Sequence, residues 1–352
     1  MSDNADKSLL ERVSFPSIPD EAQKKIAYLQ EEFLRSEVDQ MRRSIPVKAP
    51  LFEKRNEIIN IPEVKADFWI RVFSSAPAEI DEYILPSDAG VLGESLKGFT
   101  VERFEINEKG EGEPRSLRFI FEFDENNSFF EDKKLVKEFY WRQQVTKTAS
   151  GKSKLWEGLV SEPVRINWKK DKDVTKGLLD ATCDLFDAEK KGGERIKLPE
   201  YEKLIQKIDV AEAEAEGLEE DEELDQSPYG ISFFNFFGYR GRDVTAEQSK
   251  EAEKFGEERW AKIQKGEPVD DDEEDDEDDE LTNDLESAEA FPDCEDVAIA
   301  LAEDLWDDAM KYYVQSFELG DLEDLDFDEM EDIEEEDEDE ESHPRKKARG
   351  GN

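Results

Sequence analysis

Acidic side chains are the most numerous candidates for chemistry in this chain, and most of them occur in runs. The chain has 352 residues, with 95 Asp or Glu against 47 Lys or Arg, so its formal net charge is −48. Most of the excess lies in three blocks, at residues 211–226, 267–290 and 318–341. Runs of like charge repel themselves, stay solvated and usually act as interaction tails. Such a chain attracts basic proteins and repels nucleic acid and anionic membranes, over a screening length of about 8 Å at physiological salt.

One acidic stretch has the spacing of a calcium-binding loop. In DLDFDEMEDIEE, Asp324, Asp326 and Asp328 take positions 1, 3 and 5 of an EF-hand loop, and Glu335 takes position 12. Position 6, where the turn of such a loop needs glycine, is Glu329, and no pair of helices is evident around it. We interpret the stretch as part of a generic acidic tail, and we expect neither a metal nor a cofactor.

The residues that catalysis needs are missing from the region that can fold. The single histidine, His343, lies in the C-terminal tail, which leaves no base or ligand for a Ser-His-Asp, Cys-His or His-based zinc site. Neither a GxxxxGK[ST] phosphate loop nor a GxGxxG turn occurs. Carboxylate pairs are so common that no single pair is informative. We therefore predict that the protein is not an enzyme.

The sequence also indicates where the protein works. Cys183 and Cys294 are far apart, so they give no disulfide framework and fit a reducing compartment. No run of about 20 apolar residues predicts a membrane span, and the first residues lack the pattern of a signal peptide. The end of the chain, HPRKKARGGN, reverses the sign of the charge and is typical of a nuclear import signal, although a basic end by chance and a tether for the acidic tail are alternatives. The basic residues are Arg345, Lys346, Lys347 and Arg349.

The N-terminal region predicts one amphipathic helix. Pro19, Asp20 and Glu21 form a helix-start signal, and apolar residues then recur every three or four positions. The apolar stripe must pack either on its own domain, which is the commoner outcome, or on a second copy of the chain, as in a coiled coil. We expect Pro46 and Pro50 to interrupt the helix. The stripe that we assign to dimerisation contains Ala22, Ile26, Leu29, Phe33, Val38 and Met41.

Further along, the pattern predicts an α+β fold. Residues 66–85 predict two short helices, with Phe68, Trp69, Val72 and Phe73 facing a core. Alternating apolar residues then predict an antiparallel sheet with one wet face. The four expected strands lie at 98–106, 116–126, 135–143 and 162–170, and helices are expected at about 172–191, 198–209 and 293–317.

The densest aromatic cluster of the chain, SPYGISFFNFFGYRG, lies between two acidic blocks. On a short helix, three of the residues Phe233, Phe234, Phe236 and Phe237 would share one side. We interpret them as a plug that closes the sheet domain, because each buried Phe contributes about 1.5–3 kcal/mol. The alternative is an exposed aromatic patch for a partner.

Three segments in this order resemble the nucleosome assembly protein family, and most closely its SET-type branch, also called template-activating factor. They are FIFEFDENNSFFEDKKLVKEFYW, VRINWKKDKDVTK and SFFNFF, and the likeness covers about residues 20–317 and the acidic tail. The resemblance implies a long helix that pairs with its twin, and an earmuff domain in which helices back a four-stranded sheet. Two features depart from it: Pro46 and Pro50 interrupt the long helix, and the segment between Gly238 and Pro292 is a long acidic insertion.

The resemblance also implies a histone chaperone, with core histones and a second copy of itself as partners. Asp173 and Thr175 match the family pattern for histone contact. Further candidates are Glu122, Asp124 and Glu125 at the end of a strand, and Asp321, Glu323, Asp324, Asp326 and Asp328 in the tail. For each of these residues, an ordinary solvated charge is the alternative.

These inferences give the following organisation. We expect a disordered N-terminus at 1–17, a dimerisation-helix region at 18–62, an earmuff domain at 63–266 with an acidic loop at 211–226, an acidic disordered insertion at 267–292, a closing helix at 293–317 and an acidic tail at 318–352. We expect a nuclear protein, with or without shuttling to the cytoplasm. Two other functions stay open. The resemblance to the SET-type branch implies a regulator of a protein phosphatase or a histone acetyltransferase as one of them, and a passive acidic buffer for basic proteins is the other.

Overall fold

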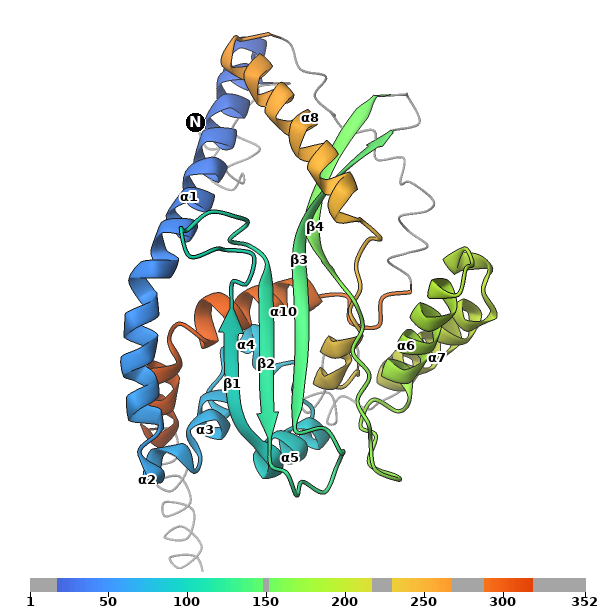
Figure 1. The fold of residues 1–352 in the computed structure, drawn as a ribbon. Helices are drawn as coiled ribbons and strands as arrows, with labels where there is room; N and C mark the ends of the chain where they lie inside the picture. Colours follow the sequence, from blue (N-terminus) through green and yellow to red (C-terminus); the bar gives the residue numbers. More distant parts are fainter. Residues whose placement is uncertain (1–17, 148–151, 217–229, 268–287, 319–352) are drawn as a thin grey trace, which may run out of the picture.

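The computed structural model describes residues 18–147, 152–216, 230–267 and 288–318, and the fold has the predicted α+β class (Figure 1). A four-stranded antiparallel sheet in the order β1-β2-β3-β4 forms its centre. The expected N-terminal disorder, the tail and most of the acidic insertion lie outside the described residues. No helix among the described segments is long and apolar enough to cross a bilayer.

Alternation of apolar and polar residues determines how the sheet is buried. Its strands are β1 (Leu96–Glu102), β2 (Leu117–Phe123), β3 (Lys134–Lys147) and β4 (Ser153–Ser161). Across the first three strands, Phe99 pairs with Phe121, which pairs with Leu135, and all three are buried. Neighbouring positions carry Glu102, Arg118 and Glu138, which form ion pairs on the other face. The sheet therefore has one core face and one wet face, as predicted.

The prediction of the fourth strand was wrong. Residues 153–161 form β4, whereas 162–170 contribute only an isolated bridge between Phe130 and Trp168. Proline has no backbone N–H to donate to a ladder, so Pro163 ends the strand pairing. The chain after β4 then runs beside the aromatic segment, residues 227–241 of the sequence. There the Val164 N–H donates to the Phe237 carbonyl at 2.8 Å.

The expected interruption of the N-terminal helix was also wrong. Helix α1 (Asp20–Ile59) continues for 40 residues through Pro46 and Pro50. Packing at both ends offsets the two lost backbone hydrogen bonds. Near the C-terminal end, the Arg55 guanidinium lies 3.9 Å from the centre of the Trp306 ring and donates to the Trp306 carbonyl. A short helix, α2 (Pro62–Lys65), follows α1.

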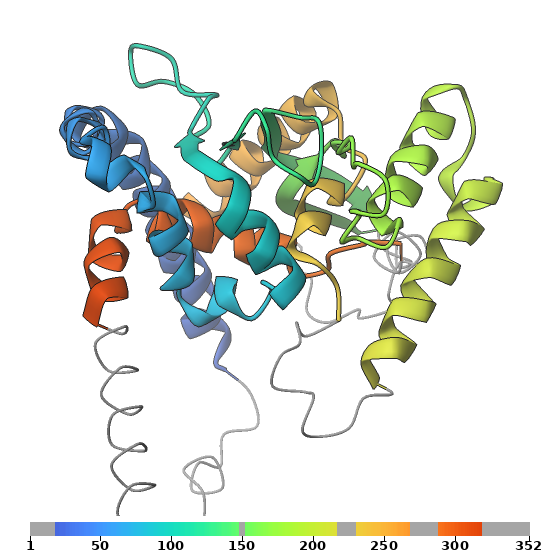
Figure 2. The ribbon, with the colours of Figure 1, turned by 90° about the horizontal axis from the view of Figure 1, so that it is seen from below.

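A layer of helices covers the core face of the sheet (Figures 1 and 2). Its members are α3 (Phe68–Ser74), α4 (Ala78–Asp81), α5 (Pro86–Ser95) and α10 (Cys294–Ala300). As predicted, Phe68, Trp69, Val72 and Phe73 are buried. The late helix also returns to this layer, but a π-helical turn at Leu301–Leu305 separates α10 from a last helical stretch at 309–318.

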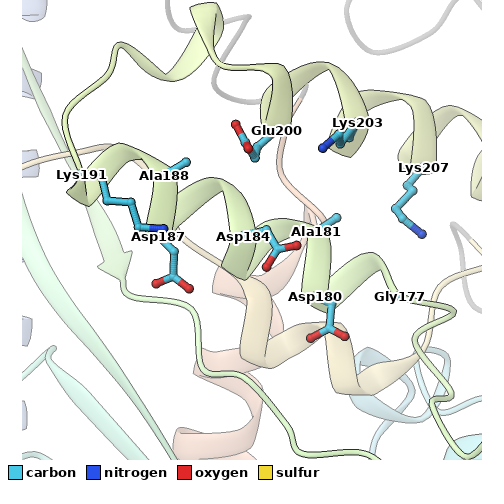
Figure 3. A pocket seen from close by; sticks show the side chains of 10 residues that line it. All are labelled: Gly177, Asp180, Ala181, Asp184, Asp187, Ala188, Lys191, Glu200, Lys203 and Lys207. Atoms are coloured by element: carbon cyan, nitrogen blue, oxygen red, sulfur yellow. The ribbon is translucent and has the colours of Figure 1, made fainter.

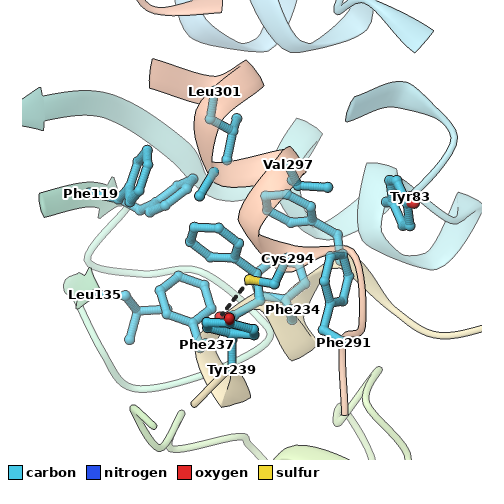
Figure 4. Packing of buried hydrophobic residues seen from close by; sticks show 14 of the residues in the cluster. Tyr83, Phe119, Leu135, Phe234, Phe237, Tyr239, Phe291, Cys294, Val297 and Leu301 are labelled. Carbon is cyan, nitrogen blue, oxygen red and sulfur yellow. Dashed lines mark hydrogen bonds between the residues drawn. The ribbon is translucent and has the colours of Figure 1, made fainter. Parts of the chain in front are cut away.

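The aromatic segment closes this core. It forms a 3-10 helix, η4 (Phe233–Gly238), and all four of its phenylalanines are 0% exposed. The Phe236 ring packs edge-on against Phe119, with 5.3 Å between ring centres. Figure 4 shows the aromatic rings gathered beneath α10, with Cys294, Val297 and Leu301 turned toward them. The plug is confirmed, and the alternative of an exposed aromatic patch is wrong.

Two segments near the acidic blocks are more ordered than we expected. Residues 288–292, assigned above to the acidic insertion, reach the core, where Ala290 and Phe291 are buried. Helix α7 (Pro199–Glu216) extends beyond the expected end at residue 209 and takes in the first part of the expected acidic loop. It packs against α6 (Leu178–Lys190) on the side of the domain opposite to α1 (Figure 2).

The sequence analysis did not predict α2 and α5, nor a longer helix at Ala246–Gln264. Helix α8 (Ala246–Gln264) links the N-terminal half of α1 to the far end of β3 (Figure 1). Its Trp260 stacks on Tyr28 with 5.3 Å between ring centres, and Glu257 pairs with Arg35 at 2.9 Å. Its Ser249 hydroxyl accepts the Gln143 N–H at 3.0 Å. The segment between Gly238 and Pro292 thus holds an ordered strut as well as acidic sequence.

Candidate functional site

The folded residues that we predicted for histone contact lie at the end of β2 and on two loops that pack together. The first loop follows β2 and the second leads into α6. The Glu131 N–H donates to the Asn167 carbonyl at 3.0 Å, and the Lys169 N–H donates to the Phe129 carbonyl at 2.7 Å. These bonds bring the two groups of candidates to one end of the domain.

The candidates after β2 are open to solvent. The side chains of Asp124 and Glu125 are 43% and 72% exposed. Glu125 pairs with Lys133 at 2.8 Å, and Asp124 lies 3.9 Å from Lys97. Exposed pairs of this kind contribute little to stability. Glu122 is also exposed, so all three carboxylates remain accessible.

The candidates on the second loop have a structural role. The Asp173 carboxylate accepts the Thr175 N–H at 2.9 Å, the Thr175 hydroxyl at 2.6 Å and the Gly177 N–H at 2.7 Å. Thr175 is only 4% exposed. Gly177, with φ of 78°, caps the start of α6. Asp173 and Thr175 therefore position α6, which carries the acidic groups described next.

A row of carboxylates on α6 surrounds one arginine. Arg165 lies 2.7 Å from Asp180, 2.8 Å from Asp184 and 3.5 Å from Asp187. Burial by itself lowers the pKa of Arg165, but its hydrogen bond to Asp184 and the nearby negative charges raise that pKa above its usual value. We call Asp180, Asp184 and Asp187 the acid row. Three carboxylates around one guanidinium leave a surplus of negative charge.

The acid row forms one wall of a groove between α6 and α7. The groove has a volume of about 460 Å³, and small residues such as Ala181 and Ala188 line its α6 side (Figure 3). Lys203 and Lys207 line it from α7. Glu200 also lines it from α7, and Lys191 lies just after α6 (Figure 3). The groove therefore has four carboxylates and three ammonium groups, and three of the carboxylates lie along α6.

Sequence reasoning missed the acid row. Its residues are three or four positions apart, at 180, 184 and 187, and on a helix this spacing places them on one face. That spacing was the available signal. It was obscured because acidic residues are common throughout the chain.

The predicted dimerisation stripe of α1 is partly open. Ile26, Leu29 and Phe33 are 43%, 48% and 63% exposed. Ala22, Val38 and Met41 are half-buried, and Met41 contacts Arg103 of its own domain. An exposed apolar row continues toward the end of the helix. Its further members are Val47, Leu51 and Ile58.

Several predicted site residues lie outside the described segments. They are the tail carboxylates Asp321, Glu323, Asp324, Asp326 and Asp328 and the basic residues Arg345, Lys346, Lys347 and Arg349. Within the described segments, no group of three or more His, Cys, Asp or Glu side chains is arranged to hold a metal ion.

Comparison with known proteins found a similar sequence and similar solved structures. A putative nucleosome assembly protein of Schizosaccharomyces pombe is 35% identical over 150 residues, which is 42% of this chain and 58% of the relative's length. The crystal structure of Ccp1 is similar at 24% identity and a TM-score of 0.46, over 84% of this chain and 96% of that chain. The crystal structure of Vps75 is similar at 17% identity and the same TM-score of 0.46, over 85% of this chain and 99% of that chain.

The family comparison covers most of the folded part. The sequence model described as nucleosome assembly protein (NAP) matches residues 60–316. This range holds the whole sheet, the aromatic plug and the acid row. The chain therefore belongs to the nucleosome assembly protein family.

Proposed function

We propose that this protein is a histone chaperone without enzymatic activity, and that the acid row is its grip on core histones. The observation that carries the proposal is the contact of Arg165 with Asp180 and Asp184 at 2.7 and 2.8 Å. Histones are rich in arginine and lysine, and an arginine from a histone would find the same donor-to-carboxylate geometry along the row. Membership of the NAP family supports the same conclusion.

In this proposal the folded domain and the acidic tail make different kinds of contact with histones. Arginine forks bind carboxylates through paired hydrogen bonds, so the acid row and the exposed Asp124 and Glu125 supply specific contacts. The acidic tail at 318–352 supplies many weak, screened contacts that raise the rate of capture. Binding of this kind shields the charge of a free histone without competing with the many contacts of an assembled nucleosome.

The open stripe on α1 supports a homodimer as the working form. Exposed apolar residues at positions 26, 29 and 33 continue at 47, 51 and 58, so one face of a 40-residue helix lacks a cover within the described part of its own chain. A second copy of α1 would supply the same stripe, as in a symmetric interface. The dimer would present two acid rows to one histone pair. We propose a nuclear location, from the family and from the basic cluster at the end of the chain.

An assembly assay with purified components tests the proposal. Core histones are mixed with plasmid DNA at physiological salt, with and without the full-length protein, and supercoiling is measured. We expect the protein to suppress aggregation and to raise the yield of nucleosomes. A protein that only lowers the free histone concentration, as a polyglutamate of equal charge does, would be a passive buffer. A protein that acts only on an added phosphatase or acetyltransferase would be an enzyme regulator.

A further inference from the structure

A second cleft is lined by more positively than negatively charged side chains, unlike the groove between α6 and α7. It has a volume of about 250 Å³ and lies between β3, β4, α6 and the segment that leads into α8. Although the whole chain carries a net charge of −48, four arginines line this cleft, and only two carboxylates among the described residues, those of Glu162 and Asp243, line it with them. The arginines are Arg142, Arg195, Arg240 and Arg242.

Two of these arginines share a single carboxylate. Arg240 donates to the two oxygens of Glu189 at 2.7 and 2.9 Å, and Arg195 donates to the same carboxylate at 3.0 Å. All three side chains are nearly buried, with 10%, 10% and 13% exposed for Arg240, Arg195 and Glu189. A second buried carboxylate, that of Glu289, accepts the backbone N–H groups of Arg240 and Gly241 at 3.1 and 3.0 Å and adds negative charge behind this pair. The positive surplus therefore lies in the lining of the cleft, where four guanidinium groups stand against two carboxylates.

One donor of this buried arginine pair lacks a hydrogen-bond partner among the described residues. The Nε of Arg240 is buried and has no hydrogen-bond partner in the part of the chain that the structure describes. Burial and the charge of Arg240 lower the pKa of Arg195. A buried unpaired donor carries an energetic penalty that is larger when the group is charged.

The other arginines are held in place before any ligand arrives. The Arg242 guanidinium lies 4.8 Å from the centre of the Trp156 ring, and that of Arg142 lies 4.7 Å from the centre of the Tyr140 ring. Arg142 also donates to Glu105 at 3.1 Å. Fixed side chains lose little further entropy on binding, which favours affinity.

We propose that this cleft binds a phosphoryl group, either as the free ion or as part of a phosphorylated peptide. A phosphoryl group carries about −1.5 to −2 charges near neutral pH and three strong acceptor oxygens. Arginine forks match these oxygens in pairs. A single carboxylate carries one charge and two oxygens, so it satisfies fewer of the donors. The acidic blocks of the chain are therefore weaker occupants than a phosphoryl group.

Calorimetric titration of the full-length protein tests this assignment. The probes are inorganic phosphate, a phosphoserine peptide, its unphosphorylated form and a glutamate-rich peptide, all at one ionic strength. We expect saturable binding at one site per chain for phosphate or the phosphopeptide. Arg242→Gln should weaken that binding at least tenfold. Arg43→Gln, which removes the same charge from an exposed position of α1, should leave it unchanged.

The outcomes separate the sources of the ligand. A phosphopeptide that binds at least tenfold more tightly than phosphate identifies a peptide-borne group, and equal affinities identify the free ion. The assignment is overturned if neither probe binds saturably, if the glutamate-rich peptide binds as tightly, or if both variants lose affinity equally. If circular dichroism shows that Arg242→Gln does not fold, Arg195→Lys is used in its place. It should also weaken phosphate binding at least tenfold, and unchanged binding would overturn the assignment.

Discussion

The ammonium group of Lys137 lies 2.7 Å from the carbonyl oxygen of Tyr239. It also donates to the carbonyls of Glu162 at 2.9 Å and Phe237 at 3.1 Å, and its side chain is 0% exposed. The strand pattern places position 137 on the core face, where an apolar residue is the rule. A buried ammonium is tolerable only because all three of its donors are used. Lys137 therefore ties β3 to the end of the aromatic plug and to the chain that follows β4.

Replacing Lys137 should destabilise the fold. Lys137→Met removes the charge but leaves three buried carbonyls without this donor, so we expect the free energy of unfolding to fall by about 3 kcal/mol. Urea denaturation measures the change. Lys134→Met, at the exposed start of the same strand, is the matched control and should change stability by less than about 0.5 kcal/mol. Equal effects of the two variants would show that the three hydrogen bonds contribute no net stability.

A buried carboxyl group should make stability depend on pH. Asp88 accepts the Phe233 N–H at 2.8 Å and the Ser232 hydroxyl at 2.6 Å, and burial raises its pKa from 3.8 to about 6. Between these two pH values the folded chain holds a proton that the unfolded chain has released. The contribution of Asp88 to stability is therefore fully present below pH 3.8 and is lost as the pH rises through 6.

Asp88→Asn should remove this dependence, because the amide stays neutral and can still accept the backbone N–H. The stability of the variant relative to the wild type should rise by up to about 3 kcal/mol between about pH 4 and pH 7. Thermal unfolding across this range gives the difference. Glu94→Gln, at an exposed position of α5, serves as the control and should follow the wild type. A constant difference between Asp88→Asn and the wild type would contradict the expected titration.

The stripe on α1 makes a prediction about oligomeric state. Phe33 and Leu29 are 63% and 48% exposed, and each contributes about 1.5–3 kcal/mol when fully buried. Leu29→Glu together with Phe33→Glu should raise the dimer dissociation constant by about 100-fold or more, since a symmetric interface contains each residue twice. Sedimentation velocity measures this. Val210→Glu alters a similarly exposed residue on α7 and should leave the dimer intact. A wild-type chain that sediments as a monomer would refute the proposed dimer.

Helix α8 should detach from α1 when its aromatic contact is removed. Trp260 stacks on Tyr28, and the Arg35 guanidinium lies 5.0 Å from the centre of the Trp260 ring. Aromatic and cation–π contacts each contribute about 0.5–1.5 kcal/mol. Trp260→Ala should therefore raise amide exchange in 246–264 several-fold and leave β2 protected. Lys262→Ala is the control on the same helix. Unchanged exchange in α8, or loss of protection in β2 as well, would argue against a separate strut.

The sequence predicted the parts of the fold that have strong local patterns. Alternation located β1, β2 and β3, and the spacing of Phe68, Trp69, Val72 and Phe73 located a core helix. Prediction from the sequence failed where contacts between distant residues override a local preference. Contacts such as Arg55 with Trp306 hold α1 together across two prolines. Helix α8 has one buried residue, Ala252, so its sequence lacks the wide apolar face from which an amphipathic helix is predicted.

The site was harder to predict than the fold. The sequence suggested Asp173 and Thr175 for histone contact, and in the structure the hydrogen bonds of Asp173 to Thr175 and Gly177 position the start of α6. The acid row is a surface feature of a helix in a chain with 95 acidic residues, and only the fold separates it from the others. The arginine cleft joins residues 142, 195, 240 and 242, whose proximity no local pattern encodes.

Histone binding by the acid row can be measured with one pair of variants. The first changes Asp180, Asp184 and Asp187 together to Asn, and the second changes Glu247, Glu251 and Glu258 of α8 to Gln, with the same loss of charge. Each full-length protein is titrated with each purified core-histone pair across a salt series. We predict that the α6 variant binds at least one pair about tenfold more weakly at physiological salt, a loss of about 1.4 kcal/mol, while the α8 variant matches the wild type. Equal affinities for the two variants would contradict a specific grip by α6 and would leave only the summed charge of the chain as the source of binding.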